Sequence, residues 1–279
     1  MKLPKPRKII AEKYVAGLSL FKSRRSPIKL SANESALGPS PKAVKSYSSI
    51  GKGFVRYPDS DGTFFRKVLA KKFRLKRDRI ILGSGSDQIF ELVCKLFLSK
   101  GDEVIVPEYS FIIYRIYSRM FGAKVRYAKE ENFKPSVQSI LDQVSRKTKI
   151  VFLANPNNPT GTYLDKFEIL KLRKKLRSNI LLVIDDAYYE YINDPNYSSG
   201  IQLFSKSKNV LVTRTFSKIY GLAGLRIGWG YGSKEIIKKL YEIKPPFNVS
   251  RPALFAATQA VQDSKWLNKA INHNNFWAE

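Results

Sequence analysis

Short runs of consecutive apolar residues recur along this chain of 279 residues, and amphipathic stretches separate them. Strands that are apolar on both faces are typical of a sheet covered by helices on both sides, and alternation of strands with helices makes such a sheet largely parallel. We therefore expect an α/β fold with a mostly parallel sheet flanked by helices on both faces. The expected strands are residues 79–82, 104–106, 124–128, 149–153, 180–184, 210–213 and 225–229. Helices are expected at 88–99, at 111–121, near 165–177 and from 252 onward.

The composition allows a substantial core and argues against several kinds of site. Hydrophobic residues make up 43% of the chain, so a folded protein is expected. A single cysteine, Cys94, cannot form an intramolecular disulfide, and a single histidine, His273, excludes histidine-cluster metal sites and argues against a Ser-His-Asp triad. No apolar run is long enough to span a membrane, and no secretory apolar segment follows the basic N-terminus. We expect a cytoplasmic protein without a bound metal.

The formal net charge of +27 predicts attraction to polyanions, of which nucleic acid is the obvious one. The alternative is a solvated surface that is rich in lysine. Scattered placement favours this alternative, since many basic residues lie on apparent amphipathic helices: Lys71, Lys72, Lys171, Lys174, Lys175, Lys238 and Lys239. We expect no specific nucleic-acid partner. A basic nucleic-acid-binding protein or a non-catalytic protein remains the alternative to an enzyme.

Unusual polar and glycine-rich segments follow the expected strands: GSGSD at 83–87, PEYS at 107–110, NPNNPTG at 155–161, DDAY at 185–188 and TFSK at 215–218. In open α/β sheets, ligands bind beyond the carboxyl ends of the strands, which is where these segments lie. Each segment has an ordinary reading as well. GSGSD can cradle a phosphate or only begin a helix, NPNNPTG can be a tight turn, and Lys218 can be one more solvated lysine.

Taken together, the segments match the needs of one cofactor. A lysine amine forms a Schiff base with an aldehyde, and pyridoxal phosphate also needs an acid at its ring nitrogen, a donor to its ring oxygen, a stacking aromatic and a phosphate cradle. Lys218 and Asp185 provide the amine and the acid, and GSGSD provides a cradle. The remaining candidates are Asn158 and Tyr188 for the ring oxygen, Tyr109 for stacking, and Arg226, Thr215 and Ser217 for the phosphate.

The chain resembles the fold-type I pyridoxal-phosphate aminotransferases, and most closely the histidinol-phosphate aminotransferases. The segments that carry the resemblance run in family order up to about residue 250: KYVAG (13–17), LSANESALGPSPKA (30–43), RYPD (56–59), GSGSDQIFEL (83–92), PEYSFIIY (107–114), ANPNNPTGTYL (154–164), DDAYYEY (185–191) and RTFSKIYGLAGLRIGWG (214–230). The resemblance implies the fold-type I architecture, with a mostly parallel mixed sheet. It also implies transamination between histidinol phosphate and 2-oxoglutarate, a step of histidine biosynthesis.

Carried over position by position, the resemblance gives each candidate a role. Lys218 would hold the cofactor and shuttle the proton, and Asp185 would pair with the ring nitrogen. Asn158 and Tyr188 would bond the ring oxygen, and Tyr109 would stack on the ring. The phosphate would be surrounded by Gly85, Ser86, Asp87, Thr215, Ser217 and Arg226. Tyr57 would reach the phosphate of a neighbouring subunit, which implies a homodimer, and Tyr14 and Asn33 would lie near the substrate.

The resemblance also implies a division of the chain and shows two departures. Residues 1–45 would form an N-terminal arm and part of a small domain, 46–250 the large cofactor-binding domain, and 251–279 the start of an interdomain helix. The rest of the small domain, with the family's substrate-carboxylate arginine, would be missing, so we expect a chain cut short with an incomplete small domain. The family's N-E-N-P reads Asn33-Glu34-Ser35-Ala36 here. An aromatic-amino-acid aminotransferase and a threonine-phosphate decarboxylase remain alternatives within the fold.

Overall fold

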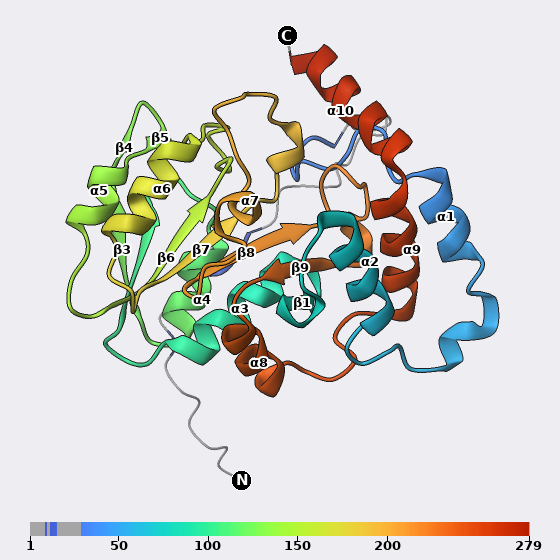
Figure 1. Cartoon of the computed structure of the whole chain (residues 1–279), viewed down its shortest axis with the longest axis horizontal. Helices are drawn as coiled ribbons and strands as arrows, with labels where there is room; N and C mark the ends of the chain where they lie inside the picture. The colour runs from blue at the N-terminus through green and yellow to red at the C-terminus, as the bar shows by residue number, and fades with distance from the viewer. Residues whose placement is uncertain (1–8, 10–11, 16–28, 279) are drawn as a thin grey trace.

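One mixed sheet of seven strands organises the molecule (Figure 1). The computed structural model describes residues 9, 12–15 and 29–278, so about half of the expected N-terminal arm lies outside the described residues. The strand order is β1-β9-β8-β7-β6-β2-β3. The bounds in that order are β1 (Ile80–Gly83), β9 (Gly228–Tyr231), β8 (Val210–Thr215), β7 (Leu181–Asp185), β6 (Thr148–Ala154), β2 (Glu103–Pro107) and β3 (Lys124–Ala128).

The direction of the strands brings the polar segments to one edge. β8, β7, β6, β2 and β3 pair in parallel, whereas β9 is antiparallel to both β8 and β1. β1 therefore runs in the same direction as β8, and the carboxyl ends of all strands except β9 lie at the same edge. A hairpin of β4 (Glu130–Glu131) and β5 (Lys134–Pro135) forms a small second sheet. The prediction of a mostly parallel, mixed sheet is confirmed.

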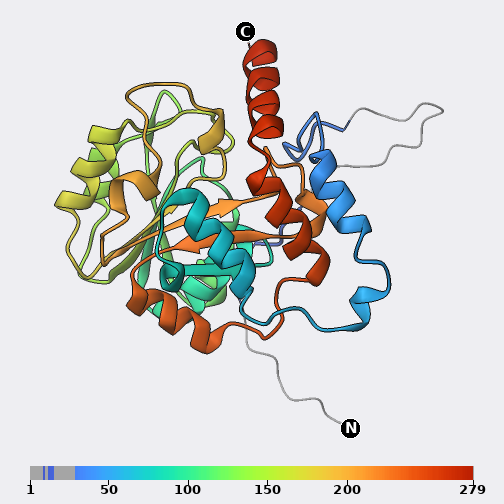
Figure 2. The ribbon, with the colours of Figure 1, turned by 45° about the vertical axis from the view of Figure 1, so that its right-hand side comes forward.

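Helices cover both faces of the sheet, as predicted. One face carries α3 (Gly85–Phe97), α4 (Ile113–Met120) and α8 (Lys234–Ile243), whose apolar residues share one buried cluster. The opposite face carries α2 (Thr63–Phe73), α5 (Val137–Asp142), α6 (Lys166–Lys175), α7 (Gly200–Phe204) and α9 (Arg251–Gln262). The helix α1 (Pro41–Ser48) packs against α9, and α10 (Ser264–Ala278) extends beyond the body of the protein (Figure 2).

The alternation of side chains along β7 decides what Asp185, its last residue, and Asp186, the residue after it, can reach. Leu181 and Val183 belong to the cluster beneath α3 and α4, whereas Leu182 and Ile184 belong to the cluster on the opposite face. Because successive side chains of a strand point to opposite faces, Asp185 continues the first row and Asp186 continues the second. The same alternation separates Thr213 from Arg214 on β8. The two adjacent acids therefore serve different environments.

Two sequence predictions differ from the structure. The strand expected at 225–229 begins later, as β9, because Ala223–Leu225 forms a short 3-10 helix and Arg226 adopts a left-handed conformation with φ of 50°. The single helix expected from residue 252 onward is divided into α9 and α10 at Asp263. This residue has a ψ of 71°, and its carboxylate accepts a hydrogen bond from the Trp266 N–H at 3.3 Å. The apolar pattern is continuous across this junction, so only the polar cap marks it.

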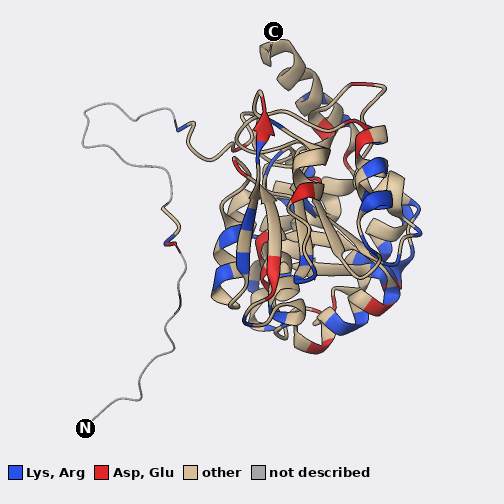
Figure 3. Cartoon of the chain, turned by 90° about the vertical axis from the view of Figure 1, so that its left-hand side faces the viewer, with Lys and Arg blue, Asp and Glu red and all other residues tan. Residues whose placement is uncertain are grey.

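Basic residues are spread over many elements, as Figure 3 shows for one side of the molecule. The lysines expected on amphipathic helices lie on α2, α6 and α8. Within the part of the chain that the structure describes, no helix has the length and apolar character needed to cross a bilayer. The absence of a specific nucleic-acid partner stays a prediction. So does the division into three segments, whose boundary at residue 45 falls within α1.

Candidate active site

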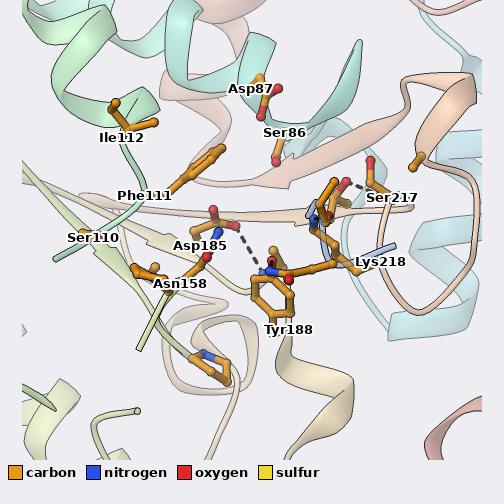
Figure 4. A pocket seen from close by; sticks show the side chains of 18 of the residues that line it. Ser86, Asp87, Ser110, Phe111, Ile112, Asn158, Asp185, Tyr188, Ser217 and Lys218 are labelled. Atoms are coloured by element: carbon orange, nitrogen blue, oxygen red, sulfur yellow. Dashed lines mark hydrogen bonds between the residues drawn. The ribbon is translucent and has the colours of Figure 1, made fainter. Parts of the chain in front are cut away.

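A cavity of about 570 Å³ opens at the edge of the sheet where the parallel strands end (Figure 4). Its walls come from five strand ends and from the segment 31–34, which are far apart in the sequence. The predicted site residues that line it are Tyr14, Asn33, Ser86, Asp87, Asn158, Asp185, Tyr188, Thr215, Ser217, Lys218 and Arg226. The structure thus gathers most of the predicted residues in one place, whereas Gly85, Tyr57 and Tyr109 are not among the lining residues.

Lys218 enters the cavity from a tight turn after β8. The turn is closed by the Gly221 N–H donating to the Lys218 carbonyl at 2.9 Å and by the Leu222 N–H donating to the Phe216 carbonyl at 2.9 Å. The Lys218 Nζ donates to the Ala32 carbonyl at 2.9 Å and lies 5.6 Å from the centre of the Tyr188 ring. Burial lowers the pKa of the Lys218 amine, against the opposing effect of Asp185 and Asp87. A lowered pKa increases the fraction of the amine that is unprotonated near neutral pH, which is the form that acts as nucleophile and proton acceptor.

Asp185 lies at the inner end of the cavity and is almost fully buried, with 6% of its surface exposed. Its carboxylate accepts hydrogen bonds from the Tyr114 hydroxyl at 2.7 Å, the Thr213 hydroxyl at 3.2 Å and the Ala187 N–H at 3.2 Å. Burial raises the pKa of Asp185 to about 7, and the bonds from Tyr114 and Thr213 oppose that rise. A cationic ring nitrogen beside this carboxylate would favour its ionised form, and the carboxylate would favour the cation in return.

The segment 31–34, which precedes the other lining segments in the sequence except Tyr14, forms one wall of the cavity. Asn33, in a left-handed conformation with φ of 52°, donates from Nδ2 to the Tyr188 hydroxyl at 3.1 Å. Lys218 and Tyr188 are therefore both held by neighbouring residues of this segment. Burial raises the pKa of the Tyr188 hydroxyl, which keeps it protonated as a hydrogen-bond donor near neutral pH.

The opposite end of the cavity is built to receive an anion. The Arg226 guanidinium donates to the Ser217 hydroxyl at 3.2 Å and pairs with Asp87 at 3.2 Å. Ser86 and Asp87 stand in the first turn of α3, where free backbone N–H groups and the helix dipole favour negative charge. Burial raises the pKa of Asp87, and Arg226 opposes that rise. The Arg226 guanidinium and the helix N-terminus are the groups at this end that favour a phosphate or a similar dianion.

Gly85 does not line the cavity but makes room for Arg226. Gly85 has a φ of +78°, and a Cβ built on it would lie 2.4 Å from the Arg226 Nη2. We expect Gly85→Ala to strain the backbone and displace the guanidinium, weakening binding of a phosphate-bearing cofactor by about 10- to 100-fold. Equilibrium titration of the protein with pyridoxal phosphate measures the effect. The matched control is Gly224→Ala, since a Cβ on that glycine meets nothing within 4 Å. Equal affinity in the two variants would contradict the assignment.

Two of the predicted aromatic residues, Tyr109 and Tyr57, do not line the cavity. Tyr109 is absent from the cavity wall, is 47% exposed and contacts Phe133 with a ring-centre distance of 5.6 Å. Phe111 lines the cavity instead, because the chain after β2 turns so that the second aromatic of PEYSF faces inward. Tyr57 is 79% exposed and stacks on Phe247 at 4.6 Å, away from the cavity of its own chain. Its role toward a neighbouring subunit stays a prediction.

The structure adds residues that the sequence analysis did not single out. Tyr114 and Thr213 bond Asp185 from α4 and β8, and both occupy positions that read as ordinary core. On the opposite face of the sheet, the buried Arg214 guanidinium lies 3.4 Å from the centre of the Tyr189 ring, 3.8 Å from Asp186, and donates to Ser199 at 2.7 Å. This cluster ties the ends of β7 and β8 together behind the cavity. In the sequence, the signal that could have pointed to this cluster is the position of Arg214 between Thr213 and Thr215.

Comparison with known proteins places this chain in a family. The sequence model of the family described as aminotransferase class I and II matches residues 25–275. The chain is 52% identical to a histidinol-phosphate aminotransferase of Pelagibacter ubique, over 98% of this chain and 76% of that protein. It is 41% identical to the Maricaulis maris histidinol-phosphate aminotransferase, over 95% of this chain and 73% of that protein. The chain belongs to the class I and II aminotransferase family.

A solved structure agrees with the sequence relatives. The crystal structure of histidinol-phosphate aminotransferase from Sinorhizobium meliloti in complex with pyridoxal-5'-phosphate superimposes with a TM-score of 0.83 at 26% identity. The match covers 86% of this chain and 65% of that chain. Within the aminotransferase family, this chain is therefore similar to proteins that carry the name histidinol-phosphate aminotransferase, and it spans about three quarters of the length of the sequence relatives given above.

Proposed function

We propose that the protein is a pyridoxal-phosphate-dependent aminotransferase that exchanges the amino group between histidinol phosphate and 2-oxoglutarate, a step of histidine biosynthesis. The observation that carries the proposal is the meeting of Lys218 and Asp185 in one cavity whose other end holds Arg226 at a helix N-terminus. The family and the names of its relatives support the same reaction.

The residues present fit the cofactor. Arg226, Ser217 and the first turn of α3 would bind the phosphate, and the missing side chain of Gly85 leaves room for the guanidinium. Asp185 would meet the ring nitrogen, Asn158 and Tyr188 would bond the ring oxygen, and Phe111 offers the aromatic face for which Tyr109 was predicted. Thr215 accepts the Ser217 N–H at 3.1 Å and so fixes the loop that holds the phosphate end.

When bound, pyridoxal phosphate supplies an electron sink for the bonds of the substrate's α-carbon. The chain's own residues then have distinct tasks. Lys218 Nζ would remove the proton from the substrate α-carbon and would return a proton later in the reaction. The lowered pKa of the amine favours the unprotonated form that can accept this proton. Asp185 keeps negative charge at the end of the cavity where the ring nitrogen must remain protonated. Tyr14 and Asn33 also line the cavity and would lie near the substrate.

We further propose a cytoplasmic homodimer. Tyr57 and Phe247 form an exposed stacked pair beside Phe54 and Val55, which are 71% and 84% exposed. Exposed apolar residues in one patch are typical of an interaction surface. On a second copy of the chain, Tyr57 could reach the phosphate end of the neighbouring cavity, which is the role the resemblance implies.

A substrate panel tests the proposed reaction. Purified protein with pyridoxal phosphate should form glutamate from 2-oxoglutarate and histidinol phosphate. Phenylalanine and tyrosine should react with a kcat/KM at least about 100-fold lower. In a site built for a phosphorylated donor, the polar groups that bind the substrate phosphate have no hydrogen-bond partner when an unphosphorylated donor is bound. Equal turnover of the aromatic donors would replace the proposal by an aromatic aminotransferase. Release of carbon dioxide from threonine phosphate would replace it by a decarboxylase.

A further inference from the structure

Tyr114 is a fully buried tyrosine whose ring is packed against other aromatic side chains. It is 0% exposed and stacks on Phe152 with ring centres 4.9 Å apart and planes 3° from parallel. Phe90 and Phe111 close the ring from the sides by edge-to-face contacts at 5.0 Å and 5.7 Å. Three aromatic side chains from different elements thus fix the direction of one hydroxyl, which donates to Asp185 Oδ2 at 2.7 Å.

The surroundings of Asp185 oppose its ionisation on most sides. It is buried, Asp186 follows it directly, and the Asp87 carboxylate from α3 faces it across the cavity. Lys218 is the cation that faces it from the turn after β8, and the Tyr188 hydroxyl stands beside it. Stabilisation of the carboxylate therefore depends on its hydrogen-bond donors, which are the Tyr114 and Thr213 hydroxyls and the Ala187 N–H. Of the three bonds, the one from Tyr114 is the shortest.

We propose that Tyr114 is a positioning residue that acts through Asp185. Its hydroxyl favours the ionised carboxylate and holds it at one angle, so that Asp185 presents an anion to the cavity. The consequence for a ring nitrogen rests on the proposed function, whereas the coupling between Tyr114 and Asp185 is a property of the cofactor-free protein. A tyrosine that only filled space could be replaced by phenylalanine without changing the protonation of Asp185.

The test follows the ionisation of Asp185 directly. Cofactor-free protein labelled with ¹³C at aspartate carboxyl carbons is titrated by NMR, and the Asp185 signal is assigned by its loss in Asp185→Asn. We expect Tyr114→Phe to raise the pKa of Asp185 by about one unit or more, because a hydrogen bond to a charged group is lost. Tyr117→Phe on the same helix, which removes a hydroxyl that does not bond Asp185, is the matched control. An unchanged titration of Asp185 in Tyr114→Phe would overturn the proposal.

A second measurement needs no substitution at Tyr114. In wild-type protein labelled at tyrosine Cζ, one tyrosine signal should shift with the same midpoint as Asp185, because protonation of Asp185 changes the bond that the Tyr114 hydroxyl makes. The absence of any such signal would contradict the coupling. If both measurements succeed but pyridoxal phosphate fails to bind, the role of Tyr114 toward Asp185 stands and the proposed function is wrong. The two results are therefore distinguishable.

Discussion

Replacing Lys218 with alanine is expected to lower the rate of amino-group exchange by about 10⁴-fold or more, since the substitution removes both the covalent anchor and the proton carrier. The variant should still fold, because the Lys218 side chain lies in a cavity and makes a single hydrogen bond to Ala32 among the described residues. Pyridoxal phosphate should bind to it without the visible absorbance band of a lysine-bound cofactor. Absorbance spectra and a glutamate assay measure the two effects.

The control is Lys234→Ala, which removes an exposed amine that pairs with Asp78 at 3.3 Å on the surface. This variant should keep both the band and the activity. Among so many lysines, the comparison separates the cavity amine from surface amines that react weakly with aldehydes. A Lys218→Ala variant with an unchanged spectrum would remove the basis of the account.

Replacing Asp185 with asparagine is expected to weaken binding of pyridoxal phosphate by about 100-fold or more, because the ring cation loses its partner. The same substitution should stabilise the cofactor-free protein. The pKa of Asp185 is about 7 in the folded state, against 3.8 for the free side chain. Ionisation of the buried acid thus destabilises the folded state increasingly from pH 4 upward, and this cost is complete above pH 7. We expect a gain of about 2 kcal/mol in the free energy of unfolding at pH 8.

Urea unfolding at pH 5 and pH 8 measures the gain, which should be smaller at pH 5, where Asp185 is largely protonated in the folded state. The matched control is Asp194→Asn. Asp194 is an acid whose pKa is lowered by its hydrogen bond from Tyr163, so its replacement should bring no gain at pH 8. A larger gain for Asp185→Asn at pH 5 than at pH 8 would contradict the assigned ionisation.

Much of the fold was predictable because its strands are apolar on both faces. Runs such as LLVI before Asp185 and VLV before Thr213 leave few structures other than the centre of a covered sheet. The candidate site was predictable for a related reason. Glycine, asparagine, acid and lysine residues are costly in a core but useful at the carboxyl ends of parallel strands, so their positions after apolar runs mark one edge.

The rest depends on three-dimensional relations that a linear pattern does not contain. Tyr109 and Phe111 are both aromatic, and the path of the loop between β2 and α4 decides which of them faces the cavity. Tyr114 reads as one more apolar position of an amphipathic helix, although its hydroxyl bonds an acid 71 residues away. The break at Asp263 lies within a continuous apolar pattern, so the local backbone and not the hydrophobic period sets it.

The central claim is that one lysine amine, in a chain with 50 lysine and arginine residues, is the site of covalent cofactor attachment. Incubating the protein with stoichiometric pyridoxal phosphate, reducing the adduct with borohydride and mapping the labelled peptides by mass spectrometry tests it directly. The account predicts nearly one label per chain, on the peptide that contains Lys218. Labels distributed over surface lysines, with Lys218 unmodified, would contradict it.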